Sequence, residues 1–332
     1  MILVTGAAGF IGSAFVWKLN REGCGDILLA DKLRSDDKWL NLRKRDYAGW
    51  IDKDRLFDWL EDTENAGSVE AVVHMGACSS TTERDADFLM ENNSEYTKKL
   101  WIFATKARIP FLYASSAATY GAGESGYNDE GTAAELHKLM PMNKYGWSKK
   151  IFDDWALKQT ETPPKWAGLK FFNVYGPQEY HKGRMASMVF HAFNQFRDSG
   201  NVRLFMSHKK EYADGGQLRD FVYVKDVVDI LYWMLTSPFP SGIYNLGTGK
   251  ARSFLDLALG AVRVAAGNPA LSEKDVIRYI PMPDDLREKY QYFTEAKMEK
   301  LRKAGYSKDF TSLEEGVRDY VANYLATEDP YL

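Results

Sequence analysis

The sequence predicts an α/β protein built on a doubly wound parallel sheet, followed by a smaller C-terminal α/β lobe. Two apolar strands, Ile2 to Thr5 and Asp26 to Ala30, flank a helical stretch from Phe10 to Arg21, which makes a βαβ unit. Later apolar segments alternate with helical stretches as far as Pro177, and that alternation is typical of a parallel sheet covered by helices. These segments are Ala71 to His74, Phe111 to Ala114 and Leu169 to Phe172.

The alternation weakens after Pro177. A helix near Ser187 to Asp198 and a last helix from Leu313 to Ala326 predict a substrate lobe over residues 178–332. Two later apolar segments, Asp220 to Val224 and Gly242 to Leu246, are candidates to return to the N-terminal domain of residues 1–177. We therefore expect that domain to be completed by segments near 220–250.

Composition narrows the class of protein. The chain has 332 residues, 45% hydrophobic and 27% charged, with a net charge of -3, which is ordinary for a soluble globular protein and argues against nucleic acid as a partner. Cys24 and Cys78 have neither CxxC nor metal-type spacing, so we expect no disulfide framework and no metal site. Neither a secretory signal nor a bilayer-spanning run is apparent, and we expect a cytoplasmic protein with no membrane partner.

A glycine-rich segment joins the first strand to the first helix. Gly6, Gly9 and Gly12 allow a tight turn and let a pyrophosphate approach the backbone at the helix N-terminus. Asp31 closes the next strand, where an acidic side chain binds an adenosine ribose. This order indicates a dinucleotide site in a Rossmann-type domain.

The choice between NAD and NADP rests on the neighbours of Asp31. A carboxylate alone favours NAD because it repels a 2′-phosphate. Lys32, Arg34 and Lys38 supply positive charge that favours NADP, although an ordinary solvated loop explains them too. The loop that begins at His74 and Met75 can also approach the cofactor, and Asn92 can bond a ribose or brace a loop.

A YxxxK motif supplies candidate proton-transfer groups. On a helix, the four-residue spacing puts Tyr145 and Lys149 on one face, one turn apart. A nearby ammonium stabilises a phenolate, so Tyr145 can exchange a proton with a sugar hydroxyl. Ser116 follows a predicted strand and can donate a hydrogen bond to the reacting oxygen, although hydroxyls in such a run also satisfy local backbone groups.

Together these motifs resemble the extended short-chain dehydrogenase/reductases over nearly the whole chain. Within them, the sequence is similar to the ADP-L-glycero-D-manno-heptose 6-epimerases. The segments that carry this similarity are Gly76 to Thr82, Ser115 to Gly121, Phe172 to Glu179 and His181-Lys182-Gly183.

The resemblance implies an NADP-dependent isomerase of nucleotide sugars in lipopolysaccharide biosynthesis, assembled as a homo-oligomer and, by family resemblance, a pentamer. Tyr145 and Lys182 would be the two acid/base residues at opposite faces of C6, with Lys149 tuning Tyr145. The cofactor contacts that it implies are Phe10, Ile11, Asp31, Lys32, Lys38, Lys53, Met75, Gly76, Ala77, Cys78, Ser79, Asn92, Tyr145, Lys149 and Val174.

The same resemblance implies substrate contacts in the second lobe. They are Asn173, Lys182, Arg184, His191, Phe205, Met206, Ser207, His208, Arg219 and Tyr290, with Ser116 from the first domain. Arg219 suits a diphosphate, but it equally suits a structural salt bridge with Asp220 or another acid. Arg184, Met206 to His208 and an apparent insertion over Glu211 to Gln217 depart from the family pattern and bear on the nucleotide pocket.

Three other functions stay open. A UDP-sugar 4-epimerase shares the glycine loop, the serine and the YxxxK motif. A 4,6-dehydratase would need an acidic pair beside the catalytic hydroxyl, where this chain has Ala117 and Ala118. A noncatalytic NADP-binding regulator or scaffold would bind cofactor without turnover. Trp101, Trp155 and Trp233 are candidates for an oligomer interface or, more simply, for core packing.

Overall fold

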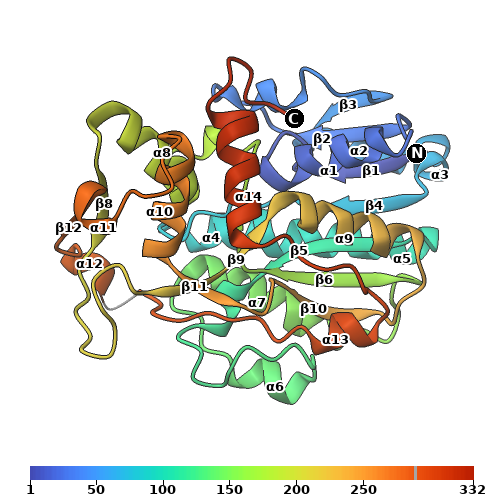
Figure 1. Cartoon of the computed structure of the whole chain (residues 1–332). Coiled ribbons are helices and arrows are strands. Elements are labelled where there is room, and N and C mark those ends of the chain that lie inside the picture. Colours follow the sequence, from blue (N-terminus) through green and yellow to red (C-terminus); the bar gives the residue numbers. More distant parts are fainter. Residues whose placement is uncertain (288–289) are drawn as a thin grey trace.

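A seven-stranded parallel sheet forms the larger part of the molecule (Figure 1). The structure is a computed structural model that describes residues 1–287 and 290–332. The strand order is β10-β6-β5-β4-β1-β2-β3. The strands are β1 (Ile2–Thr5), β2 (Ile27–Asp31), β3 (Gly49–Asp52), β4 (Ala71–His74), β5 (Phe111–Ser116), β6 (Trp166–Phe171) and β10 (Gly242–Leu246).

Helices cover both faces of this sheet. Helices α1 (Phe10–Arg21) and α9 (Val224–Thr236) pack together on one face, and α5 (Tyr96–Ala107) and α7 (Lys144–Ala156) lie on the other. Burial on both faces explains why β2, β4 and β6 consist entirely of buried residues. Shorter elements complete this part: η1 (Asp37–Leu42), η2 (Lys53–Arg55), α2 (Leu56–Glu61), α3 (Thr63–Ser68), α4 (Ala86–Leu89), η3 (Met90–Glu95), η4 (Ala117–Tyr120) and α6 (Ala133–Lys138).

A smaller lobe lies beside the carboxyl ends of the strands, at the left of Figure 1. It contains a three-stranded sheet in the order β11-β9-β7 and a two-stranded sheet of β12 and β8. Its elements are β7 (Asn173–Tyr175), η5 (Tyr180–Met185), α8 (Met188–Ser199), β8 (Val202–Phe205), β9 (Leu218–Tyr223), β11 (Ala251–Ser253), α10 (Phe254–Ala265), α11 (Glu273–Val276), β12 (Ile277–Ile280), α12 (Asp284–Arg287), α14 (Leu313–Tyr320) and η6 (Val321–Leu325). The short helix α13 (Glu299–Lys303) instead packs beside β10 of the large sheet.

The doubly wound sheet and the smaller lobe confirm the predicted fold class. The two later apolar segments, which were candidates to complete the first domain, lie in different sheets. The strand β10 joins the large sheet beside β6, whereas β9 pairs with β7 and β11 in the smaller lobe. The free edge of β6 accepts one parallel partner, and β10 takes that place. Among the described residues, no helix is both long and apolar enough to cross a bilayer.

The three tryptophans that were candidates for an interface or for core packing all contact the core, and Trp101 is buried in it. Trp101 on α5 is 1% exposed and makes edge-to-face contacts with Phe111, Phe152, Trp155 and Trp166. Trp233 likewise packs against Phe239 and Tyr306. The core-packing interpretation therefore holds for Trp101, which has too little exposed surface to contact another subunit.

Replacing Trp101 with alanine should lower the free energy of unfolding by about 3–5 kcal/mol, because a large cavity would open among four aromatic rings. Chemical denaturation monitored by circular dichroism measures this loss. The matched control is Trp147→Ala, since Trp147 is 41% exposed and its loss should cost no more than about 0.5 kcal/mol. Equal losses in the two variants would contradict the core assignment.

Candidate active site

A cavity of about 670 Å³ opens at the carboxyl ends of the large sheet. This is the edge at which doubly wound proteins bind ligands. Residues from both predicted motif groups line it together: Gly6, Gly9, Phe10, Ile11, Gly12, Asp31, Lys32, Lys38, Lys53, Met75, Gly76, Ala77, Cys78, Ser79, Asn92, Ser116, Tyr145, Lys149, Asn173, Val174 and Lys182.

The glycine turn after β1 leaves no room for side chains. Gly6 has a φ of 64°, and a Cβ there would lie 2.5 Å from the backbone nitrogen of Gly76. A Cβ on Gly12 would lie 2.1 Å from the carbonyl oxygen of Gly6. Among the described residues, no side chain caps the start of α1, and its first turn contains no acidic residue. The turn therefore fits a bound pyrophosphate, which takes the place of a cap.

Asp31 is held by the glycine turn and by one lysine. Its Oδ2 atom accepts a hydrogen bond from the Ala8 amide at 2.8 Å, and its Oδ1 atom lies 2.8 Å from the Lys38 ammonium. Lys32 instead pairs with Asp54. Lys38 thus supplies the positive charge beside Asp31, whereas the charge of Lys32 is compensated by another acid.

Two asparagines connect the remaining cofactor-side loops. Lys53 donates to Asn92 at 2.8 Å, which ties η2 to η3. Asn93, which the sequence analysis did not single out, receives the Cys78 amide at 2.8 Å and donates to the Cys78 carbonyl and the Ser148 hydroxyl of α7. Asn93 is fully buried and joins the Cys78 loop to the helix that carries Tyr145. In the sequence, the only signal for this bridging role of Asn93 is its position next to Asn92.

The YxxxK pair lies on α7 beside the end of β5. The Lys149 ammonium donates to the Ala114 carbonyl at 2.7 Å, and burial lowers the pKa of Lys149 to about 8. Burial raises the pKa of the Tyr145 phenol, and hydrogen bonding to the Ser116 hydroxyl opposes that shift. Ser116 also accepts the Ala118 amide at 3.1 Å. Ser116 is therefore linked to Tyr145, and Lys149 lies one helical turn further along α7, bound to the strand that ends at Ser116.

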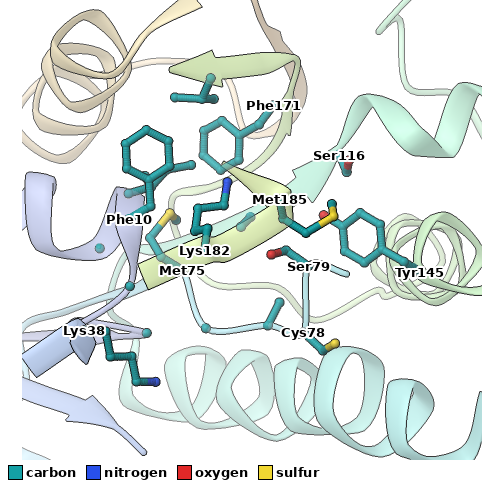
Figure 2. A pocket seen from close by; sticks show the side chains of 18 of the residues that line it. Phe10, Lys38, Met75, Cys78, Ser79, Ser116, Tyr145, Phe171, Lys182 and Met185 are labelled. Carbon is teal, nitrogen blue, oxygen red and sulfur yellow. The ribbon is translucent and has the colours of Figure 1, made fainter. Parts of the chain in front are cut away.

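Lys182 enters the cavity from η5, a different element (Figure 2). Its ammonium lies 5.0 Å from the centre of the Phe10 ring, and no hydrogen-bond acceptor contacts it within the described chain. Burial lowers the pKa of Lys182, while the charge of Glu179 opposes the shift. Such a lysine is a candidate for proton transfer, because its environment favours release of a proton.

Glu179 anchors the loop that carries Lys182. Its fully buried carboxylate accepts the Ser187 hydroxyl at 2.6 Å and also the Ser187 amide, which closes the segment from 179 to 187. Gly183, at φ 52° and ψ −125°, makes the kink inside it. The sequence analysis quoted Glu179 only as part of a family motif, since nothing local to it revealed the contact with Ser187.

The remaining predicted substrate residues lie outside the lining of this cavity, and only Phe205, Arg219 and Tyr290 among them pack together. Arg219 is buried, lies 5.2 Å from the Tyr290 ring centre and 5.6 Å from that of Phe254, and Phe254 lines the cavity. Phe205 packs edge-to-face on Tyr290, and His208 bonds Tyr292. Met206 and Ser207 join Phe205 to His208, whereas Arg184 is exposed and the partly exposed His191 packs on Phe190.

The suggested salt bridge between Arg219 and Asp220 is wrong. Asp220 accepts hydrogen bonds from Thr248, Gly249 and Ala296 instead. Arg219 donates to the carbonyls of Leu218 and Gln291, and no acid in the described chain pairs with it. Burial lowers its pKa. A buried guanidinium held by carbonyls and aromatic rings is suited to an anion from outside the chain.

This geometry agrees with three comparisons. Residues 2–247 match the model of the NAD dependent epimerase/dehydratase family. The chain belongs to this family. It is 65% identical to an ADP-L-glycero-D-manno-heptose-6-epimerase of Fusobacterium nucleatum and 50% identical to one of Nitratidesulfovibrio vulgaris, over all of each chain. The crystal structure of the Helicobacter pylori ADP-L-glycero-D-manno-heptose-6-epimerase, 26% identical, covers 97% of this chain and 95% of its own with a TM-score of 0.75.

Replacing Gly12 with alanine should weaken dinucleotide binding at least about tenfold, because the new methyl group would collide with the Gly6 carbonyl and deform the turn. Fluorescence titration with the dinucleotide measures the affinity. Gly67→Ala is the matched control, since nothing lies within 4 Å of a Cβ at that helical position. Unchanged binding by folded Gly12→Ala would place the dinucleotide elsewhere.

Proposed function

We propose that this chain interconverts ADP-D-glycero-D-manno-heptose and ADP-L-glycero-D-manno-heptose at C6, with NADP as its cofactor. The observation that carries the proposal is the convergence of Tyr145 and Lys182 on one cavity from two separate elements. A reaction that inverts one carbon needs proton-transfer groups that reach it from different sides. The 65% identity to a relative named for this reaction supports the same substrate.

The glycine turn, Asp31 and the Met75 to Ser79 loop would hold the dinucleotide. When bound, it accepts a hydride from C6 and gives it back. Tyr145 as phenolate takes the proton of the C6 hydroxyl, so loss of hydride and proton leaves a ketone at C6. Ser116 donates a hydrogen bond to that oxygen. After the carbonyl has presented its other face, the Lys182 ammonium would donate a proton to the oxygen as hydride returns. Exchange with solvent would then remove the proton from Tyr145 and restore the one lost by Lys182, so that both groups regain their starting states.

Lys149 and Arg219 support the reaction at C6 but transfer neither a proton nor a hydride. A protonated Lys149 one turn from Tyr145 favours the phenolate. Arg219 would bind the diphosphate, which places the heptose between the second lobe and the sheet. From the resemblance to the ADP-L-glycero-D-manno-heptose 6-epimerases, we place the reaction in cytoplasmic synthesis of lipopolysaccharide precursors and expect a homo-oligomer.

Tyr145→Phe and Lys182→Met should each slow epimerisation by about 10²–10⁴-fold, since each removes one proton-transfer group. The measurement is NMR of C6 stereochemistry during incubation of ADP-D-glycero-D-manno-heptose with the NADP-loaded protein. Lys209→Met, which removes an exposed lysine near Tyr292, is the control and should retain activity. An inactive, folded and NADP-loaded wild type would reject this substrate and favour a UDP-sugar 4-epimerase or a noncatalytic protein.

Lys38→Ala should weaken NADP binding about 10–100-fold while NAD binding stays the same or improves. The substitution removes the ammonium beside Asp31, whose carboxylate then repels a 2′-phosphate without compensation. Parallel titrations with NADP and NAD test this change. Lys44→Ala is the control because Lys44 faces Asp329. Equal losses for the two cofactors would contradict the selection of NADP by Lys38.

A further inference from the structure

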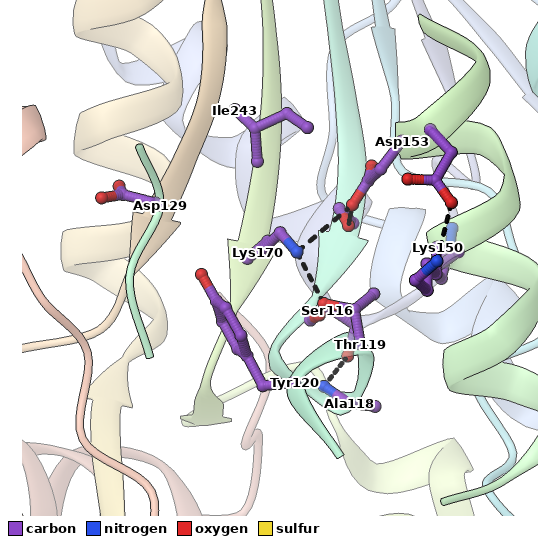
Figure 3. Close-up of polar contacts among 12 residues, drawn as sticks. Ser116, Ala118, Thr119, Tyr120, Asp129, Lys150, Asp153, Lys170 and Ile243 are labelled. Atoms are coloured by element: carbon purple, nitrogen blue, oxygen red, sulfur yellow. Dashed lines mark hydrogen bonds and ion pairs between the residues drawn. The ribbon is translucent and has the colours of Figure 1, made fainter. Parts of the chain in front are cut away.

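An ion pair is buried behind the catalytic edge, between α7 and β6. Asp153 is 0% exposed and Lys170 is 1% exposed, and the Lys170 Nζ atom lies 3.6 Å from Asp153 Oδ2 (Figure 3). Neither residue lines the cavity. A pair without contact to solvent or ligand is costly to bury unless its surroundings satisfy it. Its polar partners therefore indicate what the pair does.

Asp153 binds the strand that ends at Ser116. Its Oδ1 atom accepts the Tyr113 hydroxyl at 2.9 Å, and its Oδ2 atom accepts the Ser115 hydroxyl at 2.7 Å. Both donors belong to β5, and Ser115 directly precedes Ser116. Through these two bonds, one carboxylate of α7 fixes the carboxyl end of β5 against the helix that carries Tyr145.

Lys170 reaches Ser116 from the other side. Its ammonium donates to the Thr119 hydroxyl at 2.7 Å, and that hydroxyl donates to the Ser116 carbonyl at 2.8 Å. The same ammonium lies 4.4 Å from the centre of the Tyr120 ring. Figure 3 shows Lys170 between Asp153 and the turn that contains Thr119. The pair thus holds the backbone on both sides of the Ser116 side chain.

Asp153 also shares a helix face with the catalytic groups. Tyr145, Lys149 and Asp153 are spaced by four residues, which places them one above another along α7. Burial lowers the pKa of Lys149, and the charge of Asp153 opposes that shift. Burial raises the pKa of Asp153, and Lys170 opposes that shift in turn. The charge of Lys170 therefore favours the carboxylate form of Asp153, and that carboxylate favours an ammonium at Lys149.

We propose that Asp153 and Lys170 are positioning residues that fix the end of β5 on α7 and hold a carboxylate one helical turn from Lys149. They act through Ser116 and Lys149 and do not touch the substrate or the cofactor. The catalytic part of this inference rests on the proposed epimerase, whereas the effect on Lys149 is independent of any substrate.

Several other groups act on the same charges. Cys78 faces both Lys149 and Tyr145, and negative charge there would favour the Lys149 ammonium and oppose a Tyr145 phenolate. Asp129 and Asp154 favour the ammonium at Lys170, and His74 is the neutral, buried ring behind Lys149. The groups that face the pair or Lys149 from their surroundings are Cys78, His74, Tyr113, Ser115, Tyr120, Asp129, Tyr145 and Asp154.

The first test needs no substrate. The Lys149 13Cε resonance of protein labelled with [13C]lysine, assigned by its loss in Lys149→Met, reports the titration of that side chain. In Asp153→Asn the midpoint should fall by about one pH unit or more, because an opposite charge within one helical turn is lost. Asp154→Asn is the matched control, since Asp154 pairs with Lys150. An unchanged midpoint in folded Asp153→Asn overturns the proposal.

The second test uses the pH dependence of epimerisation. The Lys149 ammonium is present below its pKa, so a lower pKa moves the alkaline limb of kcat to lower pH in Asp153→Asn. Lys170→Met should lower kcat about tenfold or more through displacement of Ser116. Loss of stability with unchanged kcat and pH profile in both variants would show a purely structural pair. If single variants do not fold, Asp153→Asn/Lys170→Met avoids an unpaired buried charge and should show both effects.

The two tests separate two kinds of failure. A wild type that does not epimerise ADP-heptose would reject the proposed substrate and leave the Lys149 titration as the decisive measurement. A wild type that epimerises it, with a Lys149 midpoint insensitive to Asp153, would retain the function and reject the positioning pair.

Discussion

Burial of the parallel sheet on both faces is the constraint on which the rest of this structure depends. Because helices cover each face, strands such as β2, β4 and β6 can carry almost only side chains that tolerate a dry interior. The polar groups that a ligand can reach then come from the strand ends and from the connections that follow them. Asp31 ends β2 and Ser116 ends β5, and both border the same cavity.

The glycine turn makes room for an anion at that edge, and the charged pair holds the end of β5 behind it. Without a Cβ, Gly6 lets the turn after β1 pass close to Gly76, and Gly12 lets α1 pass close to the Gly6 carbonyl. The start of α1 is left open to an anion. Behind β5, Asp153 and Lys170 bring charge into the interior and are satisfied by hydroxyls on the strand and turn around Ser116. The glycine turn and the Asp153–Lys170 pair both fix the course of the backbone, and the backbone in turn positions the side chains at the cavity.

The second lobe completes the site with groups that the sheet cannot supply. Lys182 is presented by a kinked segment that Glu179 closes onto Ser187, so its position depends on a buried carboxylate. Arg219 comes from β9 and is held among carbonyls and rings. Lys182 is half-buried and Arg219 is buried, and neither has an acidic hydrogen-bond partner in residues 1–287 and 290–332, an arrangement suited to a substrate that carries negative charge and exchanges protons.

Local patterns in the sequence were enough to predict the fold class, the glycine turn and the YxxxK pair, because short-range periodicity and fixed spacing specify a βαβ unit and one face of a helix. The folded chain was needed to establish which lysine pairs with Asp31, that Arg219 does not pair with Asp220, and that β10 joins the large sheet whereas β9 does not. Asn93, Glu179 and the Asp153–Lys170 pair also emerged only there. Their partners lie far along the chain, and such contacts depend on how the strands and helices pack, which no local pattern records.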